Sequence, residues 1–108
     1  MSDPLLKHFY GGFIRLHVLY HAEKEPIFGL EMIEELGRHG YRIGPGTLYP
    51  ILHQLERDGY LKRTDKVVAG HRRKTYRATA AGRRLLKDAK AKLRELFTEV
   101  IEDRPPQR

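Results

Sequence analysis

Two short runs of helical periodicity lie close together in the middle of the chain, and this spacing limits the fold more than any other feature. Residues 29–39 and 45–58 repeat apolar side chains every three or four positions, as one face of an α-helix does. Gly40 is typical of a helix end and Pro45 of a helix start. Two helices joined this tightly predict a helix-turn-helix. The side chains expected to point inward are Leu30, Ile33 and Leu36 in the first run and Leu48, Ile51, Leu52 and Leu55 in the second.

The period changes after Gly59 from helical to strand-like. Residues 60–64 and 74–78 are predicted to form two short strands of a hairpin. The densest basic cluster of the chain, Gly70–Lys74, is expected at its tip. A basic hairpin directly after a helix-turn-helix predicts a wing. The expected fold class is therefore mainly α with a small β-hairpin, a winged helix-turn-helix over residues 1–78.

Apolar helices are predicted on both sides of this unit. Residues 4–21 form the first, and a long one begins at the N-cap Thr79 and continues to Asp103, on the order of 35 Å. Their apolar stripes exceed what so small a domain can cover, which favours a two-fold homodimer in which residues 79–108 provide a dimerisation helix and a frayed tail. The side chains expected at the interface are Phe9, Phe13, Leu86, Leu93, Leu96, Phe97 and Val100.

Charge is distributed unevenly along the chain of 108 residues. Twenty-one Lys and Arg stand against 14 Asp and Glu, a net charge of +7, and residues 41–78 alone carry 9 basic and 3 acidic side chains. Such a basic block favours a polyanionic partner, here double-stranded DNA. The chain has no Cys and no run of roughly 18 apolar residues, so we expect a soluble cytoplasmic protein without a membrane partner.

The helix that begins at Pro45 is the best candidate to enter a DNA groove. Its outward side chains carry hydroxyl, amide, aromatic and cationic groups that suit base edges and phosphates, although an ordinary polar surface would look similar. Pro50 lacks an amide hydrogen and predicts a kink. The residues expected to bind DNA are Thr47, Tyr49, Pro50, His53, Gln54 and Arg57 on the helix and His71, Arg72, Arg73 and Lys74 on the wing, with Arg42, Lys62, Arg63, Lys66 and Arg77 as backbone anchors.

Six histidines raise the question of a metal. His17 and His21 are four residues apart on the first helix, which places both imidazoles on one face, but tetrahedral sites need three or four ligands and no further partner is evident. We therefore expect no metal and no cofactor. The sequence also lacks the HExxH, GxSxG, phosphate-loop and dinucleotide-binding motifs, and we expect no enzymatic activity.

The segment GPGTLYPILHQLERDGYL, residues 44–61, strongly resembles the signature of the PadR family of transcriptional regulators. Residues 73–83, RKTYRATAAGR, resemble the wing strand and last helix of that family. The resemblance implies a homodimeric repressor that binds a palindromic operator, with Thr47, Tyr49 and Pro50 in the major groove and Arg72, Arg73 and Lys74 as wing cations. It also implies a small-molecule effector. The single C-terminal helix is similar to the short subfamily, and the absence of Trp argues against the tryptophan-based aromatic ligand site of some short relatives.

Two alternatives remain open from the sequence. The same basic face would serve a nucleoid or RNA-binding module that reads no particular sequence. A metal-responsive regulator using His17 and His21 is the other.

Overall fold

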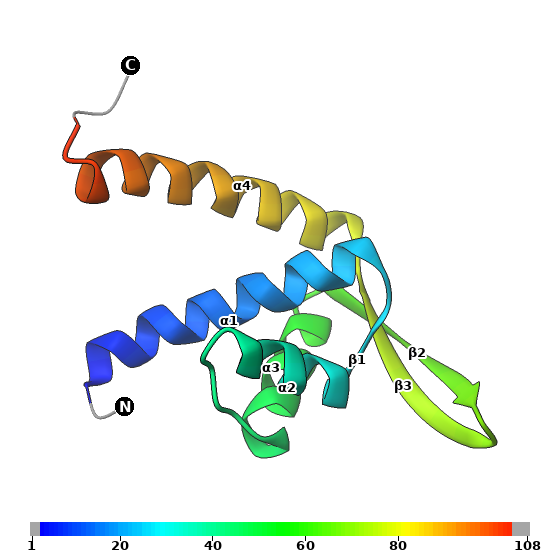
Figure 1. Ribbon diagram of the computed structural model, residues 1–108. Helices are drawn as coiled ribbons and strands as arrows, with labels where there is room; N and C mark the ends of the chain where they lie inside the picture. The colour runs from blue at the N-terminus through cyan, green and yellow to red at the C-terminus, as the bar shows by residue number, and fades with distance from the viewer. Residues whose placement is uncertain (1–2, 105–108) are drawn as a thin grey trace.

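The computed structural model describes residues 3–104, and the expected frayed tail lies outside this range except for Arg104. These residues form four helices and a three-stranded sheet (Figure 1). In chain order the elements are α1 (Pro4–Lys24), β1 (Ile27–Phe28), α2 (Gly29–Arg38), α3 (Pro45–Arg57), β2 (Leu61–Val68), β3 (His71–Ala78), α4 (Ala80–Leu96) and the π-helical turn η1 (Phe97–Ile101).

Helix α1 begins at a proline and is capped by Asp3, whose carboxylate accepts a hydrogen bond from the Leu5 amide at 2.9 Å. It continues to Lys24, one turn beyond the predicted end at His21. The helix ends at the C-cap residue Glu25, directly before Pro26, because the residue before a proline is disfavoured in the helical conformation.

The helix-turn-helix is confirmed, with α2 and α3 close to the predicted bounds. The turn after α2 is closed by the Tyr41 amide, which donates to the Leu36 carbonyl at 2.9 Å, while Gly40 takes a positive φ of 88°. One inward assignment on α2 is wrong. Leu30 is 56% exposed, and Met32 is buried in its place because the buried face of α2 is rotated from the predicted one.

The three strands pair in the order β1-β3-β2, all antiparallel. β1 was not predicted, because two residues are too few to show a period. The hairpin is longer than expected, since β2 and β3 continue to Val68 and from His71. Ala69 and Gly70, with φ of 53° and 79°, form the turn, as in a tight type I′ hairpin. The prediction of a tip at residues 70–74 is therefore wrong, because all but Gly70 belong to β3.

Helix α4 is anchored to the winged unit at its first turn. The predicted N-cap Thr79 is confirmed, because its hydroxyl accepts from the Gly82 amide at 3.0 Å and donates to the Gly59 carbonyl at 2.6 Å. A β-carbon at position 82 would lie 2.2 Å from the Tyr60 carbonyl oxygen, so only glycine fits this joint. The regular helix ends at Leu96 and η1 ends at Ile101, short of the predicted Asp103.

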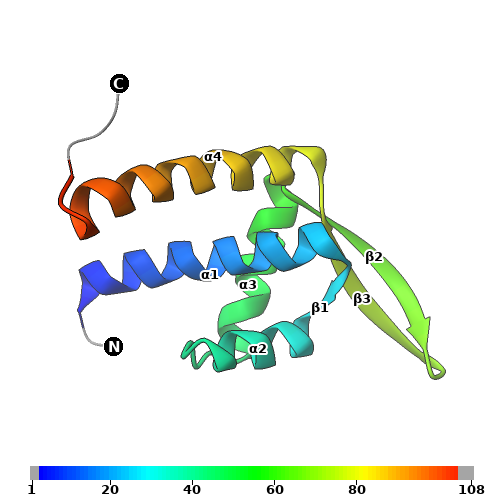
Figure 2. The ribbon, with the colours of Figure 1, turned by 45° about the horizontal axis from the view of Figure 1, so that its top comes forward.

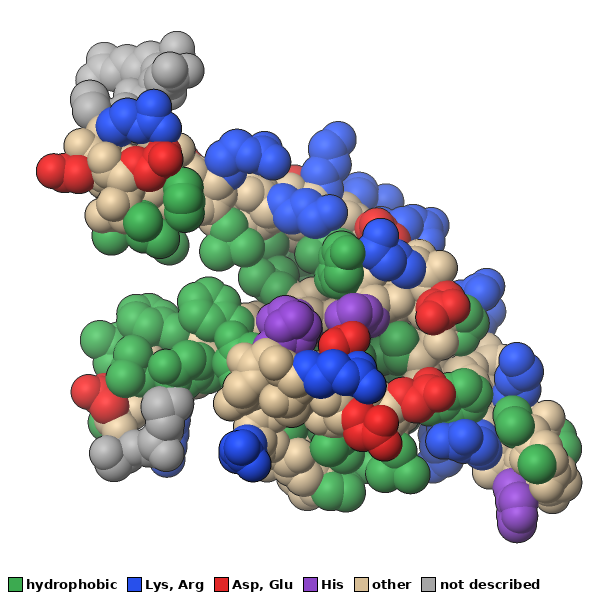
Figure 3. All heavy atoms as spheres, viewed as in Figure 1, with side chains coloured by type: hydrophobic (Ala, Val, Ile, Leu, Met, Phe, Trp, Pro, Cys, Tyr) green, Lys and Arg blue, Asp and Glu red, His purple; other side chains and the backbone are tan. Residues whose placement is uncertain are grey.

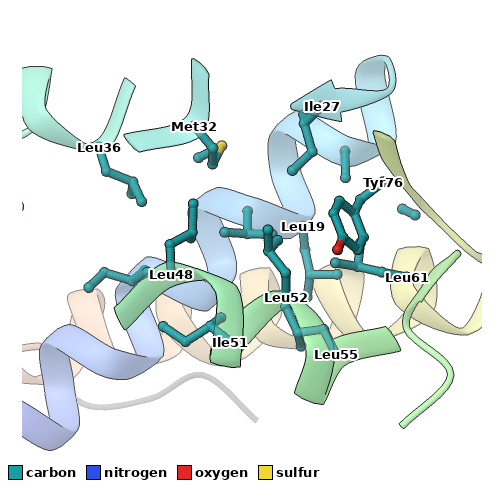
Figure 4. Packing of buried hydrophobic residues seen from close by; sticks show 14 of the residues in the cluster. Leu19, Ile27, Met32, Leu36, Leu48, Ile51, Leu52, Leu55, Leu61 and Tyr76 are labelled. Atoms are coloured by element: carbon teal, nitrogen blue, oxygen red, sulfur yellow. The ribbon is translucent and has the colours of Figure 1, made fainter. Parts of the chain in front are cut away.

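One apolar core connects α1, α2, α3, the sheet and the start of α4 (Figure 4). Tyr76, Leu19, Leu36, Leu48 and Leu52 are among its fully buried side chains. Leu86, predicted at a dimer interface, is only 3% exposed and packs in this core. That prediction is wrong because the first turns of α4 are covered by the chain's own α1.

Beyond the core, α1 and α4 diverge (Figure 1). Figure 3 shows apolar side chains on the two surfaces that face each other across this opening. Within residues 3–104, no helix is both long and apolar enough to cross a membrane.

Candidate nucleic-acid interface

Helix α3 crosses α1 (Figure 2). It buries Leu48, Ile51, Leu52 and Leu55 on one side and leaves the other side exposed. Thr47, Pro50, His53 and Arg57 are exposed, as predicted. The helix begins at Pro45, and no side chain caps its first amides. Gly44 and Gly46 reduce the side-chain cover of this turn, so a phosphate could approach its amides closely. The helix runs without interruption through Pro50, so the predicted kink does not break α3 into two helices.

Tyr49 lies at one edge of the exposed face. It is half-buried, and its hydroxyl oxygen would be 2.5 Å from a β-carbon placed on Gly29. The ring therefore packs against the backbone at the start of α2, and Gly29 makes room for it. The sequence predicts that Tyr49 projects freely from α3. In the structure its ring instead makes a contact between the two helices of the motif.

Gln54 lies at the opposite edge. Its Oε1 accepts a hydrogen bond from Nη2 of Arg15 at 2.8 Å, and Nη1 of the same guanidinium donates to the Gly11 carbonyl at 2.9 Å. The expectation that Gln54 points outward is thus only partly correct, because its acceptor oxygen is directed toward α1. The link between Arg15 and Gln54 fixes α3 on α1.

The hairpin separates its charges between two faces, because residues directly opposite in an antiparallel pair share a face. Lys62 lies opposite Arg77, and Lys66 lies opposite Arg73. These four residues form what we call the basic face. It carries no acidic side chain of either strand. Directly opposed like charges are unfavourable in an isolated hairpin, so this arrangement favours contact with a polyanion.

The other face, here called the mixed face, continues the core surface outward. It carries Arg63, Asp65, Arg72 and Lys74. Lys74 lies opposite Asp65, and Nε of Arg63 is 3.9 Å from a carboxylate oxygen of Glu56. Acidic partners therefore offset part of the positive charge on this face.

The predicted wing cluster is consequently divided. His71 and Arg73 share the basic face, whereas Arg72 and Lys74 share the mixed face. The guanidinium carbon of Arg73 lies 4.3 Å from the ring centroid of Phe28 in β1. This cation–π contact holds Arg73 in place, whereas Arg72 and Lys74 are exposed.

Most of the predicted dimer residues are exposed on α1, α4 and η1. Their exposed fractions run from 38% for Phe13 to 63% for Val100, far above those of core residues. Between α1 and α4 lies an apolar hollow of about 440 Å³. The interface candidates that the structure leaves exposed are Phe9, Phe13, Leu93, Leu96, Phe97 and Val100, joined by Leu5 and Ile101.

A histidine cluster lies at the inner end of this hollow. The structure brings His39 of the α2 C-cap next to His17 and His21, with one ring nitrogen of each within 4.8 Å of the others. Burial lowers the pKa of His17, and the neighbouring His39 and His21 lower it further. Sequence reasoning missed His39 and its neighbour Glu35, although their four-residue spacing repeats that of His17 and His21 on the adjacent helix.

Residues 18–88 match the model of the transcriptional regulator PadR-like family. The chain is 47% identical over 96 residues to the transcriptional regulator Rv3488 of Mycobacterium tuberculosis, covering 89% of this chain and 90% of that protein. A PadR-like transcription factor from Bacteroides fragilis matches with a TM-score of 0.78 at 27% identity, covering 93% of this chain and 98% of that one. A PadR family regulator from Eggerthella lenta matches with a TM-score of 0.76 at 32% identity, covering 91% and 86%.

Proposed function

The chain belongs to the PadR-like family of transcriptional regulators, and on this premise we propose that it is a repressor that binds a palindromic operator as a homodimer. It is a DNA-binding regulator and not an enzyme. In the proposed complex α3 enters the major groove and the hairpin contacts the flanking backbone. An effector that binds the protein in the cytoplasm releases the operator.

The observation that carries this proposal is the pairing of an exposed helix face with unneutralised cations. Pro50, His53 and Arg57 offer apolar and hydrogen-bonding groups to base edges, while the basic face of the hairpin offers charge to phosphates. Phosphate contacts supply affinity and register, and base contacts supply sequence preference. The two surfaces thus divide the two tasks that a sequence-specific regulator requires.

The proposed dimer is supported by the apolar surfaces of α1 and α4. Phe9, Leu96 and Val100 are among the exposed apolar side chains of these helices. Figure 3 shows apolar side chains on both surfaces of the opening, and a small monomer ordinarily shows less apolar surface to water. A second copy of α4 inserted into this opening would cover both rows at once, and a two-fold axis would repeat the contact.

The effector is proposed to act at the same opening. The hollow between α1 and α4 is lined by Phe13, Tyr20 and Leu93, among others, so a small apolar or aromatic molecule fits its chemistry. Because the hollow adjoins both the proposed dimer surface and the end of α2, a bound molecule there would alter the spacing of the two α3 helices.

Selection of genomic fragments by the purified protein tests the operator proposal. We expect one recovered palindrome, bound at least about a thousandfold more tightly than random duplex or structured RNA at the same salt concentration. Arg57→Ala and His53→Ala are expected to weaken operator binding with an unchanged circular-dichroism spectrum. Equal affinity for palindrome, random duplex and RNA would favour a non-specific nucleic-acid-binding module and refute the proposal.

Sedimentation velocity tests the dimer. Leu93→Asp introduces a charge into the proposed interface and is expected to yield monomers, whereas the matched change Leu30→Asp, on the exposed part of α2, leaves the dimer intact. A dimeric Leu93→Asp variant would show that the interface lies elsewhere.

A further inference from the structure

We propose that His17, His21, His39 and Glu35 form a binding site for a divalent transition-metal ion such as Zn²⁺ or Co²⁺ at the junction of α1 and α2. Figure 3 shows histidine side chains gathered there beside acidic ones. Imidazole nitrogen with one carboxylate oxygen is a donor set that suits these ions.

The ligand atoms already converge. One ring nitrogen from each histidine lies within 4.8 Å of the other two. The Glu35 carboxylate lies between two of them, with Oε1 4.0 Å from Nε2 of His21 and Oε2 3.6 Å from Nε2 of His39. Three imidazole nitrogens thus converge and the Glu35 carboxylate lies beside two of them, so a turn of Glu35 toward His17 would complete the four ligands of a tetrahedral site.

A bound ion would require a modest contraction of this cluster. Zinc–nitrogen bonds of about 2.0–2.1 Å place tetrahedral ligand atoms about 3.3 Å apart. The rings of His17 and His39 now stack with centroids 4.6 Å apart, so they must turn until their nitrogens point at a common centre. Glu35 must also exchange its contact with Arg38, whose Nη1 is 3.5 Å away.

The backbone that carries the ligands is well fixed. His17 and His21 are on the part of α1 that buries Val18 and Ala22. His39 is held by its own amide, which donates to the Leu36 carbonyl at 3.0 Å. Rigid backbone with rotatable side chains is what a site needs in order to form on binding.

The position of the site gives it a regulatory consequence, which rests on the proposed function. The ion would tie the C-terminal end of α2 to the C-terminal half of α1, and the short link after α2 leads directly into α3. α1 also provides part of the proposed dimer surface. Metal binding would therefore change the orientation of the DNA-reading helices relative to the dimer.

Titration of the full chain, without an affinity tag, tests the site itself. We expect Co²⁺ to produce the intense visible absorption of a tetrahedral complex at one ion per protomer, and Zn²⁺ to displace it. His39 is exposed, so His39→Ala retains the fold, and we expect it to abolish the band and weaken Zn²⁺ binding by more than about 100-fold. Glu35→Gln is expected to weaken binding by about 10- to 100-fold.

His8→Ala is the matched control, because His8 is an exposed histidine of α1 outside the cluster. We expect it to bind Zn²⁺ as the unmodified chain does. Binding that is lost equally in His8→Ala and His39→Ala, or that persists in His39→Ala, would overturn the site.

Operator affinity measured with and without Zn²⁺ tests the regulatory consequence separately. A change in affinity that disappears in His39→Ala supports it. Metal binding without any change in operator affinity overturns the regulatory role and leaves the site intact. Failure to bind any operator, with the Co²⁺ band present, overturns the proposed function and not the site.

Discussion

The division of charge on the hairpin makes a quantitative prediction about which face meets DNA. Lys62→Ala with Lys66→Ala removes two cations from the basic face, and Arg72→Ala with Lys74→Ala removes two from the mixed face. The two double variants change the net charge equally. If only the basic face contacts phosphates, only the first should alter how binding depends on salt.

The expected size follows from counterion release. In a two-fold dimer the basic-face variant removes four cations, and each lost phosphate contact makes the slope of log K against log salt less steep by about 0.9, or about 3.6 in all. Between about 50 and 200 mM salt, the unmodified protein should therefore lose about 150-fold more affinity than this variant. The mixed-face variant should keep nearly the original slope.

Fluorescence anisotropy with a labelled operator duplex, repeated over a salt series, measures both slopes. Thermal unfolding supplies the control for folding. Relief of the directly opposed like charges should leave the basic-face variant at least as stable as the unmodified chain, whereas the mixed-face variant loses the pairing of Lys74 with Asp65. An equal change of slope in both variants, or a larger one for the mixed face, would refute the assignment.

The remaining predictions concern the stability of the fold. The Tyr76 hydroxyl is buried and has no hydrogen-bond partner within residues 3–104, so Tyr76→Phe should raise the free energy of unfolding by about 1 kcal/mol in chemical denaturation. Burial also raises the pKa of Tyr76, so the unfolded chain ionises first as the pH rises through 10; stability should fall there, and less steeply in Tyr76→Phe. Gly82→Ala should cost about 3 kcal/mol or more because its β-carbon meets the Tyr60 carbonyl, while the control Gly37→Ala, in open space, should gain about 0.5–1 kcal/mol. Gly29→Ala should lower the melting temperature by displacing Tyr49, and an unchanged melting temperature would contradict the packing of that ring.

Local signals were sufficient to predict most of the helices and the wing. Pro45 and Thr79 mark helix starts that depend only on neighbouring residues, and both were placed correctly. The hairpin turn was misplaced because Ala69 has a positive φ that its residue type does not favour. Pairing along the full length of the two strands, a tertiary feature, determines that turn.

Contacts between distant segments could not be predicted in the same way. An apolar stripe does not reveal whether its own chain or a partner covers it, and Leu86 was therefore assigned to an interface although α1 buries it. Gln54 and Tyr49 were expected on the open face for a similar reason, because the positions of Arg15 and Gly29 depend on tertiary packing. His39 lies beside His17 and His21 because α2 packs against α1, and this packing has no local sequence signal.

The joint between the winged unit and α4 has a consequence for how such a protein can change. Position 82 admits no side chain, and the Tyr60 carbonyl that occupies the space also accepts from the Thr79 amide at 3.1 Å. Main-chain contacts at this joint, together with the Thr79 hydroxyl, thus set the direction in which α4 leaves the sheet. Substitutions farther along α4 can therefore change which surface the helix contacts without changing its angle to the winged unit. The choice of partner and the direction of α4 can thus vary separately in this architecture.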